Sequence, residues 1–249
     1  MTKETEQLVR IVKDSNNIVF FGGAGVSTES GIPDFRSENG LYTTGGGKKY
    51  SPEKLLSHSF FMRHTLDFFT FYKEHMIYKK AKPNQAHFAL ARLEELGKLT
   101  AVITQNIDNL HQMAGSQTVY ELHGSSNRNY CMKCRKSYEL DQIMSMDTVP
   151  ICTDCGGVIK PDVVLYEEEL NQTVVQKAIE AIEKADTMIV GGTSLVVWPA
   201  ASLLEYFNGD NLVLINKSET SYDRRASLVI QDSIGAVMDT VLQNILESE

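Results

Sequence analysis

Residues 18–36 read IVFFGGAGVSTESGIPDFR, and this stretch decides the fold. It opens with the apolar run Ile18 to Phe21, which predicts a short strand that is buried on both faces. The small residues Gly22 to Gly25 end the strand at once, and a helix is expected to begin near Ser27. A strand, a glycine-rich turn and a helix together can bind the diphosphate of a dinucleotide. Because Thr28 stands in place of the third fingerprint glycine, these residues also fit a plain tight turn.

Outside this stretch, short apolar runs alternate with segments of helical periodicity. The alternation predicts an α/β fold, a Rossmann-like doubly wound sheet of parallel strands. The expected helices are an amphipathic one around Leu8–Val12 and others over 85–96, over 173–184, from about Pro199, and up to Leu246. The further expected strands are 101–104, 187–190, 212–215 and 227–230.

Two segments break the alternation and predict an inserted small domain within one catalytic domain of residues 1–249. Residues 32–80 are interpreted as a cofactor loop and a helical insertion, because their first part is rich in Gly, Ser, Thr and Asp and their second part is aromatic and helical. A loop this long in a compact domain is usually functional. Residues 125–160 contain the cysteines and are interpreted as a zinc-binding module.

The four cysteines form two pairs of the type Cys-x-x-Cys, at Cys131/Cys134 and Cys152/Cys155, with 17 residues between the pairs. This spacing is typical of a tetrahedral zinc site with four thiolate ligands. Four protein ligands leave no open position, so the Zn²⁺ ion is expected to be structural. A redox-active pair and unliganded core cysteines are the alternatives.

Composition limits the classes of partner. Hydrophobic residues make up 42% of the chain, charged residues 22%, and the net charge is −8. The negative charge argues weakly against nucleic acid and anionic membranes as partners, and leaves basic peptides open. No secretory signal and no run of 18 apolar residues is visible, so a cytoplasmic location is expected.

The run GAGVSTESGIPDFR at 23–36 closely resembles the signature of the sirtuin family. Further short motifs match that family in the same order along the chain: TQNID at 104–108, HG at 123–124, KPDVV at 160–164, GTS at 192–194 and LIN at 214–216. Each motif is short, but jointly they are specific. The resemblance implies an NAD-dependent protein lysine deacetylase, which transfers the acyl group of acyl-lysine to ADP-ribose and releases nicotinamide and O-acetyl-ADP-ribose.

The resemblance also implies roles for single residues. His123 would be the general base that takes a proton from a ribose hydroxyl, and Asn106 and Asp108 would be the other catalytic residues. Asp108, with the backbone of Ile107, would hold the nicotinamide amide, and Phe35 would shield the ribose carbon from water. The residues implied in binding NAD are Gly23, Ala24, Gly25, Thr28, Asp34, Phe35, Arg36, Gln105, Asn106, Ile107, Asp108, His123, Gly192, Thr193, Ser194 and Asn216.

An acetylated protein or peptide would bind as a β-strand between two segments of the chain. The implied contacts are Val163, Tyr166, Leu195 and Val197. The acyl group would enter a pocket lined by Phe69 and Tyr72, which carry no positive charge and therefore favour acetyl over acidic acyl groups.

The chain departs from the family pattern at three positions. Gly22 stands where Thr is usual, Glu167 where Gly is usual, and Lys160 where Arg is more common. None of these residues is the base or part of the nicotinamide pocket, so activity is still expected.

Three other functions share some of these features. A protein ADP-ribosyltransferase would use the same NAD pocket, a zinc-ribbon binding module would release no nicotinamide, and a redox protein would not hold zinc tightly.

Overall fold

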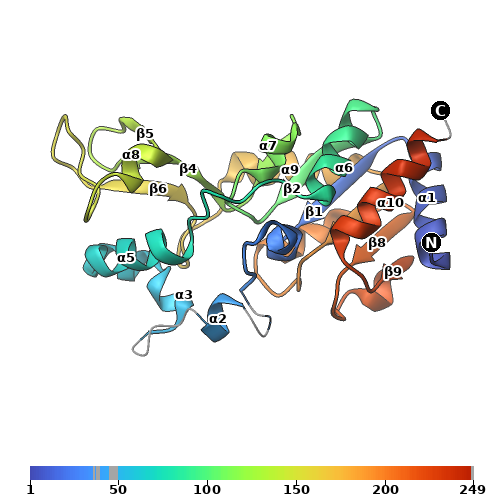
Figure 1. Cartoon of the computed structure of the whole chain (residues 1–249), viewed down its shortest axis with the longest axis horizontal. Helices are drawn as coiled ribbons and strands as arrows, with labels where there is room; N and C mark the ends of the chain where they lie inside the picture. The colour runs from blue at the N-terminus through green and yellow to red at the C-terminus, as the bar shows by residue number, and fades with distance from the viewer. Residues whose placement is uncertain (36, 38–39, 45–49, 248–249) are drawn as a thin grey trace.

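The computed structural model describes residues 1–35, 37, 40–44 and 50–247, and these form a large and a small part. In Figure 1 the large part lies at the right and contains both termini. The small part lies at the left. None of the helices within the described ranges is long and apolar enough to cross a membrane.

The large part is built on a six-stranded sheet in which all neighbouring strands run parallel. The strand order is β3-β2-β1-β7-β8-β9, which is the order of a doubly wound dinucleotide-binding sheet. The predicted fold class is therefore confirmed. The strands are β1 (Ile18–Gly22), β2 (Leu99–Thr104), β3 (Val119–Glu121), β7 (Thr187–Gly191), β8 (Asn211–Ile215) and β9 (Leu228–Ile230).

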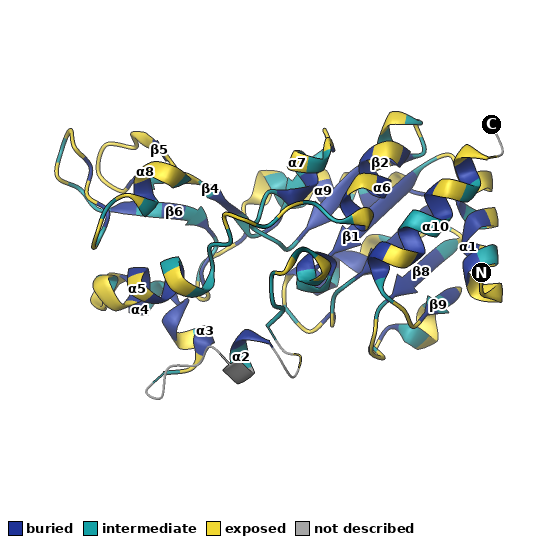
Figure 2. Cartoon of the chain, in the orientation of Figure 1, coloured by how far each residue is buried: buried dark blue, intermediate teal, exposed yellow. Residues whose placement is uncertain are grey.

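Both faces of this sheet are covered, as the apolar run of β1 predicts. Ile18 and Phe20 point into one core, and Val19 and Phe21 point into the other. The first core is closed by α1 (Lys3–Asp14), α6 (Gln85–Glu95) and α10 (Ile234–Leu246). The second is closed by α9 (Gln172–Lys184) and by η2 (Ala200–Tyr206), a 3₁₀ helix where the sequence predicted an α-helix. In Figure 2 the buried residues accordingly run along the strands between these layers.

The glycine-rich turn after β1 packs directly on the turn after β7. A side chain at Gly25 would lie 2.7 Å from the Cα atom of Gly192, so only glycine fits there. The Gly25 N–H donates to the Gly192 carbonyl at 2.7 Å, and the Gly23 N–H donates to the Gly191 carbonyl at 3.2 Å. The turn continues into η1 (Ala24–Ser30), a 3₁₀ helix that begins earlier than the expected helix at Ser27.

The helical half of the small part is an aromatic cluster. Residues 51–80, expected to be helical, form three helices, of which the first two are capped by the Ser51 and Ser57 side chains and the third begins without a side-chain cap. Aromatic side chains of the second and third of these helices pack on Val163 and Leu165, which lie at and just after the end of the strand that leaves the zinc-binding module. The helices are α2 (Leu41–Thr44), α3 (Pro52–Leu55), α4 (His58–Arg63) and α5 (Thr65–His75).

The other half of the small part is a three-stranded antiparallel sheet, in the order β5-β4-β6. Its strands are β4 (Gly124–Cys131), β5 (Ser137–Glu139) and β6 (Ile159–Val163), and α8 (Leu140–Met144) packs beside them. The short helix α7 (Leu110–Ala114) belongs to the large part. The core of this module contains only five buried side chains, and two of these are cysteines. A core this small does not stabilise a module unaided.

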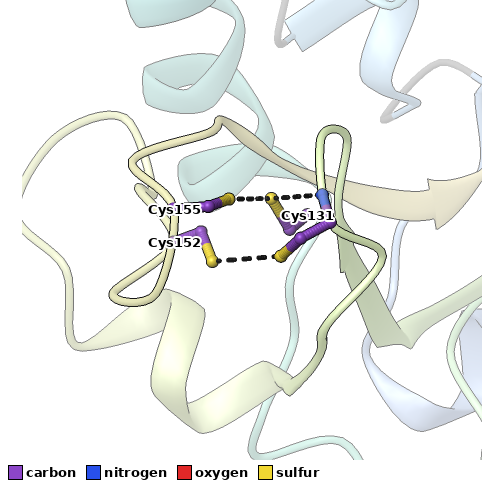
Figure 3. Close-up of side chains that lie close together, drawn as sticks. Cys131, Cys152 and Cys155 are labelled. Carbon is purple, nitrogen blue, oxygen red and sulfur yellow. Dashed lines mark hydrogen bonds between the residues drawn. The ribbon is translucent and has the colours of Figure 1, made fainter.

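The four cysteine sulfurs gather at one end of this sheet and all lie within 4.8 Å of one another. The sulfurs of Cys131 and Cys155 are 3.4 Å apart and those of Cys134 and Cys152 are 3.6 Å apart (Figure 3). Zn–S bonds in a tetrahedron place sulfurs roughly 3.8 Å from one another. The Tyr138 hydroxyl also donates to the Cys152 sulfur at 3.1 Å, as expected for an outer partner of a metal ligand. The donor set therefore fits one Zn²⁺ ion.

We predict that the purified protein carries one zinc ion per chain and that Cys131→Ala loses it. Because metal binding supplies folding free energy that the small core cannot, the variant should unfold roughly 10 °C below the parent. Elemental analysis and thermal unfolding measure the two effects. Arg10→Gln, which breaks only an exposed ion pair with Glu6, is the control. A metal-free Cys131→Ala protein with the unfolding temperature of the parent would contradict a structural role.

Candidate active site

One large cavity opens at the carboxyl edge of the parallel sheet and has a volume of about 1400 Å³. Residues that follow β1, β2, β3, β7 and β8 line it, which is where doubly wound sheets bind their ligands. The volume exceeds that of a typical single-ligand pocket and leaves room for two reactants. The sequence-predicted residues that line it are Ala24, Gly25, Thr28, Asp34, Phe35, Gln105, Asn106, Ile107, Asp108, His123, Gly192, Thr193, Ser194 and Asn216.

Among the described residues, one predicted cofactor residue is not on this wall. Arg36 lies outside the described residues. Gly23 lies beneath the wall, where a side chain would meet the Cβ atom of Thr193 at 2.8 Å. Since the N–H groups of Gly23 and Gly25 are engaged by the β7 turn, these two glycines serve the packing of the two turns.

Three polar side chains, one from η1 and two from the segment after β2, form a hydrogen-bonded chain inside the cavity. The amide of Asn106 donates to the Ser27 hydroxyl at 3.1 Å and to the Gly23 carbonyl at 3.1 Å. Ser27 in turn donates to a carboxyl oxygen of Asp108 at 2.6 Å. The other carboxyl oxygen of Asp108 accepts from the Leu110 N–H at 2.9 Å. The orientations of Asn106 and Asp108 are thus fixed.

Burial and hydrogen bonding act on Asp108 in opposite directions. Burial raises the pKa of its carboxyl, and the hydrogen bonds from Ser27 and the Leu110 N–H partly offset the rise. The charge of Glu121 raises the pKa further. Ser27 is only 1% exposed, and its hydroxyl donates to the carboxyl of Asp108.

His123 is held in a single tautomer. Its Nδ1 atom lies 2.9 Å from the Gln105 carbonyl, and because a carbonyl can only accept, Nδ1 carries the hydrogen. The Nε2 atom is therefore the basic nitrogen. Burial lowers the pKa of the imidazole, and the hydrogen bond to Gln105 raises it by less. The net shift is downward, so the ring is neutral at neutral pH and is able to accept a proton.

Polar side chains that follow β2, β7 and β8 are hydrogen-bonded to one another in another part of the cavity. Gln105 donates to the Thr193 hydroxyl at 3.1 Å, and the Thr193 N–H donates to the Asn216 side-chain oxygen at 2.9 Å. The side-chain nitrogen of Asn216 is buried and has no partner among the described residues. A buried donor without a partner is rare, so this atom indicates a ligand acceptor in this part of the cavity.

The two segments expected to hold a peptide flank the cavity. Val163 and Tyr166 line it on one side and Val197 on the other, with the exposed indole of Trp198 beside Val197. The side chain of Leu195 is buried in the core, so only its backbone is available to a peptide. Trp198 was not singled out from the sequence, although an exposed tryptophan next to a proline was a signal for it.

The backbone of 163–166 is less open than a free strand edge. The N–H groups of Val164 and Tyr166 donate to the carbonyls of His123 and Leu56 at 3.0 Å each. The Leu165 N–H donates to the carboxylate of Glu168 at 2.9 Å. A peptide added here must therefore use the carbonyl oxygens of this segment or displace Glu168.

The structure also explains how Glu167 replaces the usual glycine. Its φ is 76°, in the left-handed region that favours glycine, and its carboxylate is anchored by the Ser59 N–H at 2.8 Å and hydroxyl at 3.0 Å. Lys160 keeps the role of a cation, because its ammonium group binds Glu168 at 3.0 Å.

Known proteins resemble this chain along nearly its whole length. The sequence model of the Sir2 family matches residues 23–199. An NAD-dependent protein deacetylase of Clostridium acetobutylicum is 62% identical over 237 residues, which cover 95% of this chain and 97% of the relative.

Two solved structures agree with this match. One, from work on the mechanism and regulation of Sir2 enzymes, superposes with a TM-score of 0.90 at 38% identity and covers all of both chains. The other, a Sir2 variant with a deacetylated p53 peptide and 3′-O-acetyl ADP-ribose, has a TM-score of 0.86 at 40% identity and covers 98% of both chains. Because the family model covers residues 23–199, the relative is 62% identical and the fold superposes over the whole chain, this protein belongs to the Sir2 family, the sirtuins.

Proposed function

We propose that the protein is an NAD-dependent protein lysine deacetylase. Acetyl-lysine, NAD and water give lysine, nicotinamide and O-acetyl-ADP-ribose. The observation that carries the proposal is the neutral His123 with a free Nε2, in the same cavity as the Asn106–Ser27–Asp108 chain. The function of the Clostridium acetobutylicum relative and the ligands of the Sir2 complex support it.

NAD, a substrate in this reaction, supplies a ribose whose nicotinamide is the leaving group and whose hydroxyl accepts the acetyl group. We assign to His123 Nε2 the removal of the proton from that hydroxyl. Burial keeps the imidazole neutral beforehand, and the Gln105 carbonyl stabilises the charged ring afterwards. A positioned base of this kind is worth ~10²–10⁴-fold in rate.

We place the nicotinamide amide against Asp108 and the Ile107 backbone, and the adenosine half against Thr193, Ser194 and Asn216. The fixed carboxyl of Asp108 suits a primary amide, because amide N–H groups can donate to it. The unpartnered nitrogen of Asn216 suits an acceptor on the adenosine. Phe35, packed edge-on against Tyr42 with ring centroids 5.7 Å apart, would cover the ribose between these ends.

We place the acetyl-lysine peptide between 163–166 and 195–197, in extended form. Its lysine would enter beside Val163 and reach His123, since both residues line the same cavity. Exposed apolar side chains at this mouth, Val196 and Trp198, would cover the peptide backbone. Carbonyl groups of both segments would supply main-chain hydrogen bonds, as in other strand additions.

His123→Ala should reduce acetyl transfer by ~10²-fold or more while leaving the fold intact, because the base is lost. The measurement is formation of O-acetyl-ADP-ribose from NAD and an acetyl-lysine peptide, with the mass of the peptide product read in parallel. His64→Ala changes an exposed histidine outside the cavity and is the control. A rate within tenfold of the parent argues against the assignment, and a peptide that gains ADP-ribose identifies a transferase instead.

The pH dependence of the same reaction should report the lowered pKa of His123. The base must be neutral, so kcat/KM falls as the pH drops through the pKa of His123. Because burial lowers that pKa below its ordinary value, the acid limb is expected to have its midpoint below pH ~6.5. A midpoint above this value would show that burial does not govern the base.

The acyl pocket should prefer acetyl-lysine to succinyl-lysine. Tyr72 lines the cavity with its side chain fully buried and its hydroxyl unpartnered among the described residues, and Phe69 packs beside it at 1% exposure. A succinyl carboxylate would lose water there, and the lysine on this part of the wall, Lys79, is already paired with Asp141 at 2.6 Å. Tyr72→Arg combined with Phe69→Tyr should narrow the ratio of the two kcat/KM values, and Tyr72→Phe, which adds no charge, should not. Equal turnover of both peptides by the parent would show that this pocket does not select the acyl group.

A further inference from the structure

Arg128 bridges two carboxylates on either side of the segment that carries His123. Its Nη1 atom lies 2.6 Å from a carboxyl oxygen of Glu121, and its Nε atom lies 2.8 Å from one of Asp162. Glu121 is the less exposed partner, at 9%, and its second oxygen accepts from Gln112 at 2.9 Å. Its negative charge is therefore almost buried and depends on Arg128 for compensation.

The bridge joins the two sheets of the molecule. Glu121 is the last residue of β3 and pairs in register with Thr104 of β2 in the large sheet. Asp162 belongs to β6 of the small sheet and pairs with Ser125 of β4. Arg128 itself lies where the β4–β6 register shifts, between Ser125 and Asn129. Such an irregularity re-aims side chains, and here the guanidinium points back toward the hinge between the sheets.

His123 sits at that hinge, with one arm of the bridge on each side. Glu121 precedes it by two residues. Asp162 lies two residues before Val164. The Val164 N–H donates to the His123 carbonyl at 3.0 Å. The next residue, Gly124, has a φ of 75°, and a side chain on it would lie 1.9 Å from the Asp162 carbonyl oxygen. The chain thus passes from one sheet to the other in a tight turn that both arms hold.

We propose that Arg128 is a positioning residue for the base, fixing the angle between the two sheets so that His123 Nε2 meets the ribose hydroxyl. The proposal rests on the deacetylase function proposed above. Arg128, Glu121 and Asp162 are absent from the cavity wall, so they contact no substrate and act through the backbone that carries His123, with the charge of Glu121 also felt at Asp108. A guanidinium suits this task because its rigid fork holds two carboxylates at once. Displacements of about 1 Å at a catalytic group cost up to ~10²-fold in rate.

Nicotinamide release and acetyl transfer can be measured separately. A comparison of the two rates distinguishes a misplaced His123 from a general loss of activity. Nicotinamide release does not need the base, and exchange of labelled nicotinamide into NAD, with acetyl peptide present, measures it. Acetyl transfer needs the base, and formation of O-acetyl-ADP-ribose measures it. Arg128→Gln should slow acetyl transfer about tenfold or more and slow exchange to a smaller extent, because exchange is affected only by the uncompensated charge of Glu121 near Asp108. Arg128→Lys keeps the positive charge but cannot hold two carboxylates in a fixed geometry. Its rate of acetyl transfer should lie between those of the parent and of Arg128→Gln.

Two further variants address charge and folding. Arg128→Gln with Glu121→Gln removes both charges without restoring the bridge, so acetyl transfer should stay slow. If Arg128→Gln does not fold, Asp162→Asn removes one arm and leaves Glu121 compensated, and it should show a smaller loss confined to acetyl transfer. Arg92→Gln, which breaks an exposed pair with Glu95 of 2.7 Å on α6, is the matched control and should change neither rate.

Three results would overturn the proposal, provided that thermal unfolding shows each variant folded at the assay temperature. They are equal slowing of exchange and acetyl transfer, no slowing of either, and recovery of acetyl transfer in the double variant. The last would mean that the uncompensated charge of Glu121, and not the lost bridge, harms the base. Failure of the deacetylase function itself is distinguishable, because the parent would then form no O-acetyl-ADP-ribose.

Discussion

The contact between the turns after β1 and β7 is the constraint on which the site depends. The Cβ atom that a larger residue would carry at Gly25 falls 2.7 Å from the Cα atom of Gly192, so the backbones touch without side chains between them. This contact lies at the point where the strand order reverses, between β1 and β7. The chain departs from this point in two directions, and the divergence opens the cavity at the carboxyl edge. Gly22 fits the same constraint, because a side chain there would meet the Phe20 ring at 2.7 Å.

Burial tunes the two titratable groups of the site in opposite directions. It lowers the pKa of His123 and raises that of Asp108, because in both cases it disfavours the charged form. The imidazole of His123 is therefore neutral. The charged form of the Asp108 carboxyl depends on the hydrogen bonds from Ser27 and the Leu110 N–H. One desolvated cavity therefore holds a neutral imidazole between β3 and β4 and an oriented carboxyl after β2.

The sequence predicted those parts of the fold that depend on local patterns. The apolar run of β1 predicted a strand buried on both faces, and the two Cys-x-x-Cys pairs predicted the sulfur cluster. It did not predict the breaks that divide 51–80 into three helices, because the aromatic pattern runs on through Ser57 and His64, where the breaks lie. The structure brings fourteen of the residues predicted to bind NAD onto the wall of one cavity, with Gly23 beneath it and Arg36 outside the described residues, while their roles stay a prediction. The hydrogen bond from Ser27 to Asp108 could not be foreseen, since 81 positions separate the two residues and only the fold brings them together.

The zinc module is connected to the cavity although its sulfurs are not part of it. Lys73 of α5 donates to the carbonyls of Met146 and Thr148, and Lys79 forms an ion pair with Asp141 of α8 at 2.6 Å. The aromatic cluster of α4 and α5 packs in turn on Val163 and Leu165, whose segment holds the carbonyl of His123 through the Val164 N–H. These contacts tie the two halves of the small part to one wall of the cavity. The four-cysteine cluster, which does not line the cavity, is therefore connected through them to the segment that holds the His123 carbonyl.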